Sequence, residues 1–121
     1  MIPRYTCAEM ERIWTEENRY NCWLEVELAA AKAMHEMGII PTQDYKEICD
    51  KADFNVRRIA EIEESTRHDV IAFLTNVAEY VGPASRWIHY GMTSSDVLDT
   101  ATALQLKQAG ELILSQLYRL A

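Results

Sequence analysis

The chain has 121 residues, which fits one domain and is long enough to bury roughly two thirds of the surface that its unfolded form would expose. Apolar residues make up 49% of it, with only four glycines and three prolines, and this composition is typical of a globular protein rather than a disordered one. The net charge of −7 excludes a general nucleic-acid or anionic-membrane surface, because both require a basic field.

The cysteines also bear on where the protein works. Cys7, Cys22 and Cys49 are an odd number and lack the spacing of a metal or redox motif, which favours free thiols in a reducing compartment. No window reaches the ~18 consecutive apolar residues of a membrane span, and the N-terminal residues contain no apolar signal core. We therefore expect a soluble cytoplasmic protein with neither a membrane nor a nucleic acid as its partner.

Apolar residues recur at helical spacing along the chain, and no stretch alternates in the manner of a strand, so we predict an all-α fold. Thr6 and Glu9 have the spacing of a capping box, which predicts that a first helix begins there. Its expected inward-facing residues are Met10, Ile13 and Trp14. Arg4 and Tyr5 would then lie just outside the cap, free to point elsewhere.

A longer helix is predicted over residues 17–37, with Gly38 placed to end it. Its broad apolar face consists of Tyr20, Trp23, Leu24, Leu28, Ala31 and Met34. Two short helices are predicted next, one following Pro41 and one over residues 55–64, and we interpret both as scaffold.

Thr66 and Asp69 predict another helix start resembling a capping box, which would place Arg67 and His68 in the first turn. The apolar residues that follow have clean helical spacing up to Gly82: Val70, Phe73, Leu74, Val77 and Val81. Positive side chains are unfavourable beside the positive end of a helix dipole, by about 0.3–1 kcal/mol each. Two of them at one helix start indicate a site for an anion.

Residues 82–91 form a predicted loop that holds Trp87, His89 and Tyr90. The aromatic rings could line a ligand site, but packing beneath the loop is the commoner outcome. From Thr93 onward we predict one helix of about 25 residues with apolar residues at heptad-like separations. These are Val97, Ala101, Leu104, Leu106, Ile113, Leu117 and Leu120. Because no stop signal follows, we expect the chain to be a piece of a longer, oligomeric protein.

The stretch from Gly91 to Asp96 carries more hydroxyl groups than a helix cap needs. Thr93 is the expected N-cap, and Ser94 and Ser95 are in surplus. The unsatisfied N–H groups of a helix start bind carboxylate or phosphate, although ordinary capping accounts for either predicted start taken alone. The residues by themselves thus predict a helical domain with two candidate anion-binding helix starts.

Histidines near these starts could donate a hydrogen bond to an anion or move a proton, and His68 and His89 are the two candidates. The histidines lack the spacing of zinc ligands, no glycine-rich phosphate loop is present, and no nucleophile with an adjacent base can be assigned. We accordingly expect neither a metal nor a cofactor.

Three motifs carry a resemblance to a known family. They are Arg4-Tyr5, the run from Thr66 to Val70, and the run from Trp87 to Thr100. In this order they resemble the N-terminal part of the adenylosuccinate lyase family, within the fumarase/aspartase superfamily, and the match covers essentially the whole chain. The last run is typical of the superfamily, while the first two point to the adenylosuccinate branch.

The resemblance implies a carbon–nitrogen lyase of purine nucleotide biosynthesis. Such enzymes release fumarate by β-elimination from adenylosuccinate, which gives AMP, and from the succinyl-aminoimidazole-carboxamide ribotide. It also implies roles for residues of this chain. Arg4 and Tyr5 would hold the nucleotide phosphate, and Arg67, His68 and Asp69 the nucleotide portion, with His68 orienting the substrate or assisting proton transfer. Thr93 and Ser94 would bind a succinyl carboxylate, with His89 and Ser95 in support.

The resemblance further implies a homotetramer built around a central helical bundle, with each site drawing residues from three subunits. Residues 1–110 would be the N-terminal helical domain, and residues 111–121 the first turns of the bundle helix. The family's general acid and base lie further along the sequence than Ala121, so we expect these 121 residues to be inactive alone.

Two alternatives remain open. One is another enzyme of the superfamily, such as a carboxymuconate cycloisomerase, an argininosuccinate lyase or an aspartase, which share the threonine-serine-serine helix start. The other is a non-catalytic helical interaction domain that binds a partner through its apolar C-terminal helix. Replacing Arg4 distinguishes the first alternative, because only a nucleotide substrate needs a phosphate-binding residue. Replacing Thr93 or His68 distinguishes the second, because an interaction domain would function without them.

Overall fold

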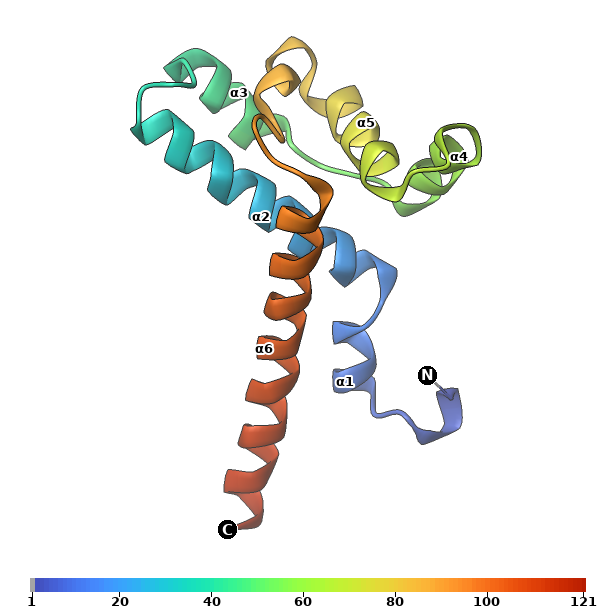
Figure 1. The fold of residues 1–121 in the computed structure, drawn as a ribbon. Helices are drawn as coiled ribbons and strands as arrows, with labels where there is room; N and C mark the ends of the chain where they lie inside the picture. The colour runs from blue at the N-terminus through green and yellow to red at the C-terminus, as the bar shows by residue number, and fades with distance from the viewer. Residues whose placement is uncertain (1) are drawn as a thin grey trace.

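The computed structural model describes residues 2–121, and these contain helices and no β-strand, which confirms the all-α prediction. Four helices, α2 to α5, form the upper part of the molecule in Figure 1. The long helix α6 extends downward out of this part, with α1 beside it. The helices are α1 (Ala8–Ile13), α2 (Glu16–Glu36), α3 (Thr42–Lys51), α4 (Val56–Thr66), α5 (Asp69–Val81) and α6 (Ser94–Leu120), and two 3₁₀ turns are η1 (Pro3–Tyr5) and η2 (Pro83–Trp87).

The core is centred on an aromatic cluster between α2 and α5. Tyr20 and Trp23 of α2 meet edge to face with ring centroids 5.1 Å apart, and Trp23 meets Phe73 of α5 in the same way at 5.4 Å. Tyr20 also stacks on Phe73 at 5.7 Å. All three side chains are buried, so the apolar face predicted for the long helix is its packing face.

Helix α6 packs against α2 through its first half. Val97 and Ala101 are fully buried there, and two polar contacts fix the crossing. Asn18 donates from Nδ2 to Oε1 of Gln108 at 2.8 Å, and Gln105 donates from Nε2 to the carbonyl oxygen of Ile13 at 2.9 Å. These bonds set the register of α6 relative to α2 and the end of α1.

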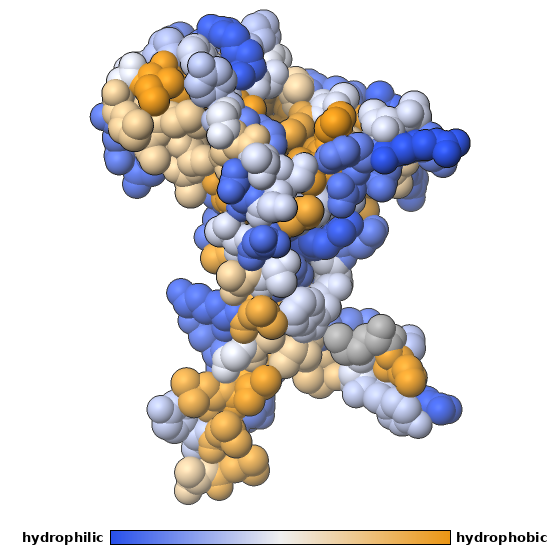
Figure 2. All heavy atoms as spheres, in the orientation of Figure 1, coloured by the Kyte–Doolittle hydropathy of each residue, from blue (hydrophilic) through white to orange (hydrophobic). Residues whose placement is uncertain are grey.

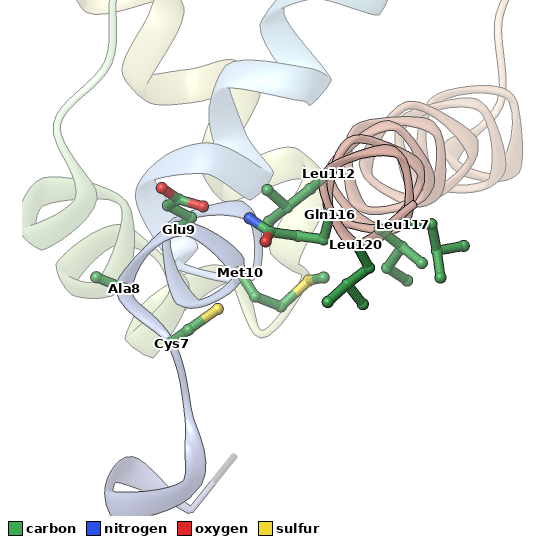
Figure 3. Close-up of a pocket in the computed structure, with 9 residues that line it drawn as sticks. Cys7, Ala8, Glu9, Met10, Leu112, Gln116, Leu117 and Leu120 are labelled. Atoms are coloured by element: carbon green, nitrogen blue, oxygen red, sulfur yellow. The ribbon is translucent and has the colours of Figure 1, made fainter.

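The second half of α6 leaves the core, and the apolar side chains predicted there stand exposed. Leu106, near the middle of the helix, and Ile113 and Leu117 beyond it are each more than half exposed, and Leu120 is 85% exposed. Figure 2 shows the resulting apolar surface on the projecting end of the molecule. Between α1 and α6 lies a groove of about 530 Å³, into which Met10 points from α1 and Leu112 from α6 (Figure 3). Helix α6 passes through Gly110 without interruption.

The first predicted helix start is wrong by one residue. Cys7, not Thr6, is the N-cap of α1, because Thr6 ends the preceding 3₁₀ turn and its hydroxyl donates to the carbonyl oxygen of Pro3 at 2.9 Å. Trp14 was predicted to face inward, but it follows the last residue of α1 and is 40% exposed. Because Trp14 lies outside the helix, the helical spacing does not determine which way its side chain faces.

The predicted start at Thr66 is also wrong. Thr66 is the last residue of α4, and Arg67 follows in the left-handed conformation, with φ 51°, which ends that helix. His68 is the N-cap of α5, and its Nδ1 accepts a hydrogen bond from the N–H of Ile71 at 3.2 Å. Neither Arg67 nor His68 therefore lies in the first turn of a helix, and the charge argument for an anion at that position does not hold.

The start of the last helix agrees with its prediction. Thr93 is the N-cap of α6, and the Asp96 carboxylate accepts a hydrogen bond from the Thr93 N–H at 2.8 Å. In the loop before it, Trp87 packs as the commoner alternative anticipated, since it is partly buried and donates from Nε1 to Asp44 at 2.8 Å, whereas Tyr90 does not and is 56% exposed. Within residues 2–121, no helix is both long and apolar enough to cross a membrane.

We predict that Phe73→Ala lowers the free energy of unfolding of the chain by about 3–5 kcal/mol, because it removes the ring on which Tyr20 and Trp23 pack. Urea unfolding followed by circular dichroism measures this loss. Ile71→Ala on the same helix is the control, since that side chain is about half exposed, and it should cost less than about 1 kcal/mol. Equal losses for the two variants would contradict the assignment of the core.

Candidate functional site

The start of α6 presents polar side chains that the helix itself does not use. Thr93 and Ser95 are exposed and Ser94 is partly buried. The hydroxyl groups of Ser94 and Ser95 make no hydrogen bond within residues 2–121. Because the first N–H groups of a helix have no partner within it and carry its positive dipole end, this segment is suited to a carboxylate or phosphate.

The junction between α4 and α5 holds the second group of predicted site residues. Arg67 and His68 are exposed, and Asp69 is partly buried. His68 Nδ1 lies 3.8 Å from the nearer Asp69 oxygen and accepts the N–H of Ile71, so a neutral His68 carries its proton on Nε2. The junction therefore offers a guanidinium and an imidazole N–H to a ligand.

Arg4 and Tyr5 lie in η1, which precedes the N-terminal end of α1, and both are exposed. The Arg4 guanidinium stands 4.9 Å from the centre of the Tyr5 ring, which keeps its donors beside the phenol group. This pairing gives two donors to one small region of the surface, as a phosphate would require.

The three groups of predicted site residues are not brought together within this chain. Figure 1 shows η1 at the lower end of the molecule, apart from both the α4–α5 junction and the start of α6. Within residues 2–121, no hydrogen bond or ion pair joins one group to another. The described residues therefore do not assemble the three groups into one site.

The structure does join His89 to a residue that the sequence analysis did not single out. His89 Nδ1 lies 2.6 Å from Oε1 of Glu27 on α2, and Glu27 is only 1% exposed. The signal for Glu27 was its spacing: it lies four residues after Trp23 and four before Ala31, on the face that the periodicity predicts to be buried. An acid in that position has to find a partner in the interior.

Burial raises the pKa of the Glu27 carboxyl above its ordinary value of 4.5, because it removes water from the charged form. The hydrogen bond and positive charge of His89 act in the opposite direction and are the weaker effects. The second carboxylate oxygen, Oε2, is buried and has no hydrogen-bond partner. The pair therefore keeps a costly, partly satisfied acid inside the fold.

The Glu27–His89 bond also holds the loop that leads into α6. His89 has φ 66°, a left-handed conformation that is uncommon for a residue with a side chain. Its carbonyl oxygen accepts the N–H of Met92 at 3.2 Å, and this turn ends immediately before Thr93. Helix α2, His89 and the start of α6 thus form one connected unit.

Comparison with known proteins identifies the family to which the chain belongs. Residues 4–121 match a protein-family model described as lyase, so the chain belongs to this lyase family. The fold agrees, since the crystal structure of a fumarate lyase from Mesorhizobium sp. BNC1 superimposes with a TM-score of 0.78 and 25% sequence identity. That likeness covers 86% of this chain and 25% of the fumarate lyase.

The chain is similar in sequence to adenylosuccinate lyases. It is 50% identical to the enzyme of Bacillus subtilis over 119 residues and 57% identical to that of Synechocystis sp. over 120 residues. The enzyme of Staphylococcus saprophyticus is also 50% identical. These matches cover 98–99% of this chain, and the chain spans 28% of the length of each of these relatives.

We predict that Glu27→Gln changes how stability depends on pH. Well below pH 4.5 the carboxyl is protonated in both the folded and the unfolded chain, so its burial carries no penalty for a charge. As pH rises from there through the raised folded pKa, the unfolded chain loses the proton first, so the wild type loses stability that the amide variant retains.

Urea unfolding at intervals between about pH 4 and about pH 8 measures this difference. The stability of Glu27→Gln relative to wild type should rise across that range, whereas Glu25→Gln, an exposed change on the same helix, should follow the wild type. A difference that is constant with pH, or that moves in favour of the wild type, would show that burial does not disfavour the charged form of Glu27.

Proposed function

We propose that the full-length protein is an adenylosuccinate lyase of purine nucleotide biosynthesis. It would release fumarate by β-elimination from adenylosuccinate, which gives AMP, and from the succinyl-aminoimidazole-carboxamide ribotide. The observation that supports this most strongly is the 50–57% identity to adenylosuccinate lyases over 98–99% of the chain. Because the chain spans 28% of those relatives, the activity is assigned to the whole protein and these 121 residues are expected to be inactive alone.

The reaction determines what the site must supply. A base removes a proton beside one carboxylate, negative charge develops on that carboxylate, and an acid protonates the departing nitrogen. Fixed donors aimed at the developing charge contribute much of the rate, about 3 kcal/mol for a single donor. We assign this donor role to Thr93 and Ser94, which would bind a succinyl carboxylate at the positive end of α6, with Ser95 beside them.

Arg67, His68 and Asp69 would bind the nucleotide portion at the α4–α5 junction. The His68 cap to the N–H of Ile71 supports this role, because it holds the ring with Nε2 directed away from the helix start as a donor. His68 would orient the substrate or assist proton transfer, while the principal acid and base lie outside these 121 residues.

Arg4 and Tyr5 would hold the nucleotide phosphate. A guanidinium forms charge-assisted hydrogen bonds with two phosphate oxygens, and a phenol adds a neutral donor. Their exposure at the end of η1 supports this assignment, since no other part of the described chain covers them. The separation of η1 from α6 would then require a site completed by other copies.

The exposed apolar side chains of α6 support a homotetramer in which this helix enters a central bundle. Residues 1–110 would be the N-terminal domain, and residues 111–121 would begin the bundle. We place the assembled enzyme in the cytoplasm and expect it to need no metal or cofactor, with the two succinyl nucleotides and their products as its small-molecule partners.

Another enzyme of the superfamily is the second candidate, and the similarity to a fumarate lyase structure is the observation that supports it. A carboxymuconate cycloisomerase, an argininosuccinate lyase or an aspartase would share the carboxylate-binding start of α6. It would have no use for a phosphate site at Arg4. A non-catalytic interaction domain would need neither site.

We predict that the full-length protein releases fumarate from adenylosuccinate, as followed by ultraviolet absorbance. Thr93→Ala should reduce kcat/KM by about two orders of magnitude, because it removes a donor to the reacting carboxylate. The purified 121-residue chain should show no turnover. Release of fumarate by the short chain would contradict the assignment of the acid and base to other residues, and an inactive full-length protein would reject the lyase function.

We predict that Arg4→Ala in the full-length enzyme raises KM for adenylosuccinate about 30-fold, corresponding to the loss of about 2 kcal/mol from charged hydrogen bonds to phosphate. Arg12→Ala, which removes an exposed arginine from neighbouring α1, is the matched control and should leave KM unchanged. If both variants behave as wild type while the enzyme accepts a succinyl substrate without phosphate, the second candidate is favoured.

A further inference from the structure

Glu27 is a costly residue for a purely structural position. It lies on the buried face of α2, is 1% exposed, and leaves Oε2 without a partner. Taking a carboxylate out of water costs free energy that a single hydrogen bond does not recover, and an apolar residue of similar size would pack there at lower cost. The presence of an acid therefore calls for a reason other than stability.

His89, its partner, is held in an equally unfavourable state. Its backbone is left-handed at φ 66°, a strain of about 1–3 kcal/mol for a residue with a side chain. Nδ1 is turned to Glu27 at 2.6 Å, while Nε2 makes no hydrogen bond within residues 2–121 and the side chain remains 19% exposed. The nitrogen available to a ligand is Nε2.

The pair is also placed beside the candidate carboxylate site. His89 begins the turn that closes on Met92, and Thr93 follows as the N-cap of α6. Glu27 comes from α2, the helix against which α6 packs. A partly buried imidazole thus stands on the segment that leads directly into the predicted binding residues.

We propose that Glu27 is a positioning residue for His89: its buried carboxylate accepts the Nδ1–H bond, fixes the orientation and tautomer of the ring, and so directs Nε2 to an anionic oxygen of the substrate beside the start of α6. A carboxylate that can only accept a hydrogen bond keeps the proton of a neutral imidazole on Nδ1. Nε2 donates to an anionic oxygen only when it also carries a proton, so the contact with the substrate requires the imidazolium form, in which Nδ1–H still donates to Glu27. The inference rests on the proposed lyase function and adds to its site a residue, Glu27, that acts on the substrate only through His89.

A double-mutant cycle in the full-length enzyme tests this inference. Glu27→Gln replaces an obligate acceptor with an amide that can also donate to Nδ1, and we expect kcat/KM for adenylosuccinate to fall at least about tenfold. His89→Gln should lower it as well, and adding Glu27→Gln to His89→Gln should have no further effect, because Glu27 acts through His89. Glu25→Gln, exposed on the same helix, is the control and should retain wild-type kinetics.

The result that would overturn the inference is a Glu27→Gln enzyme with wild-type kcat/KM, or one whose loss persists in full when His89 is already replaced. Either outcome would make Glu27 a structural residue only. Circular dichroism and thermal unfolding of each variant identify a loss that is due to misfolding.

A second measurement reads the tautomer without any activity. In the 121-residue chain, ¹⁵N chemical shifts of the imidazole nitrogens, at a pH where His89 is neutral, should show the proton on Nδ1 in the wild type and partly on Nε2 in Glu27→Gln. The His89→Gln chain identifies the His89 signals among the three histidines. An unchanged tautomer overturns the inference. If the full-length wild-type enzyme is inactive, the lyase function is rejected. The tautomer measured in the 121-residue chain would still show whether Glu27 positions His89.

Discussion

The burial of α2 is the constraint on which the rest of the structure depends. Tyr20 and Trp23 of this helix pack against Phe73 of α5, and Asn18, in its first turn, bonds to Gln108 of α6. Further along, Glu27 holds the loop that precedes α6 through His89. Because one rigid helix makes all three contacts, the position of the α6 start is set by the same core that stabilises the domain.

Helical periodicity was sufficient to predict the class of fold and most of the elements. The spacing of Val70, Phe73 and Val77 identifies α5, and Thr93 with Asp96 identifies the start of α6. Helix starts were less predictable, because Ser, Thr and Asp near a boundary all make acceptable caps. The N-cap of α5 is His68, because α4 continues as far as Thr66 and Arg67 takes the left-handed conformation.

The Glu27–His89 contact lies beyond what local patterns can reveal. Its two residues are separated by 62 positions, and neither belongs to a motif that predicts the other. The buried spacing of Glu27 indicates only that it needs a partner. The grouping of the site residues is likewise a tertiary matter: sequence order places Arg4, Arg67 and Thr93 on three helix boundaries, and the fold leaves these boundaries apart within one chain. The separated site residues and the exposed apolar half of α6 are the two observations that support the proposed assembly with other copies.

The most direct test of this account is a structure of the full-length protein with AMP and fumarate bound. We expect a carboxylate of fumarate at Thr93 and Ser94, the phosphate of AMP at Arg4 and Tyr5 of a contributing copy, and His89 between Glu27 and an anionic oxygen. Ligands bound away from the start of α6, or His89 turned away from both Glu27 and the ligand, would contradict it.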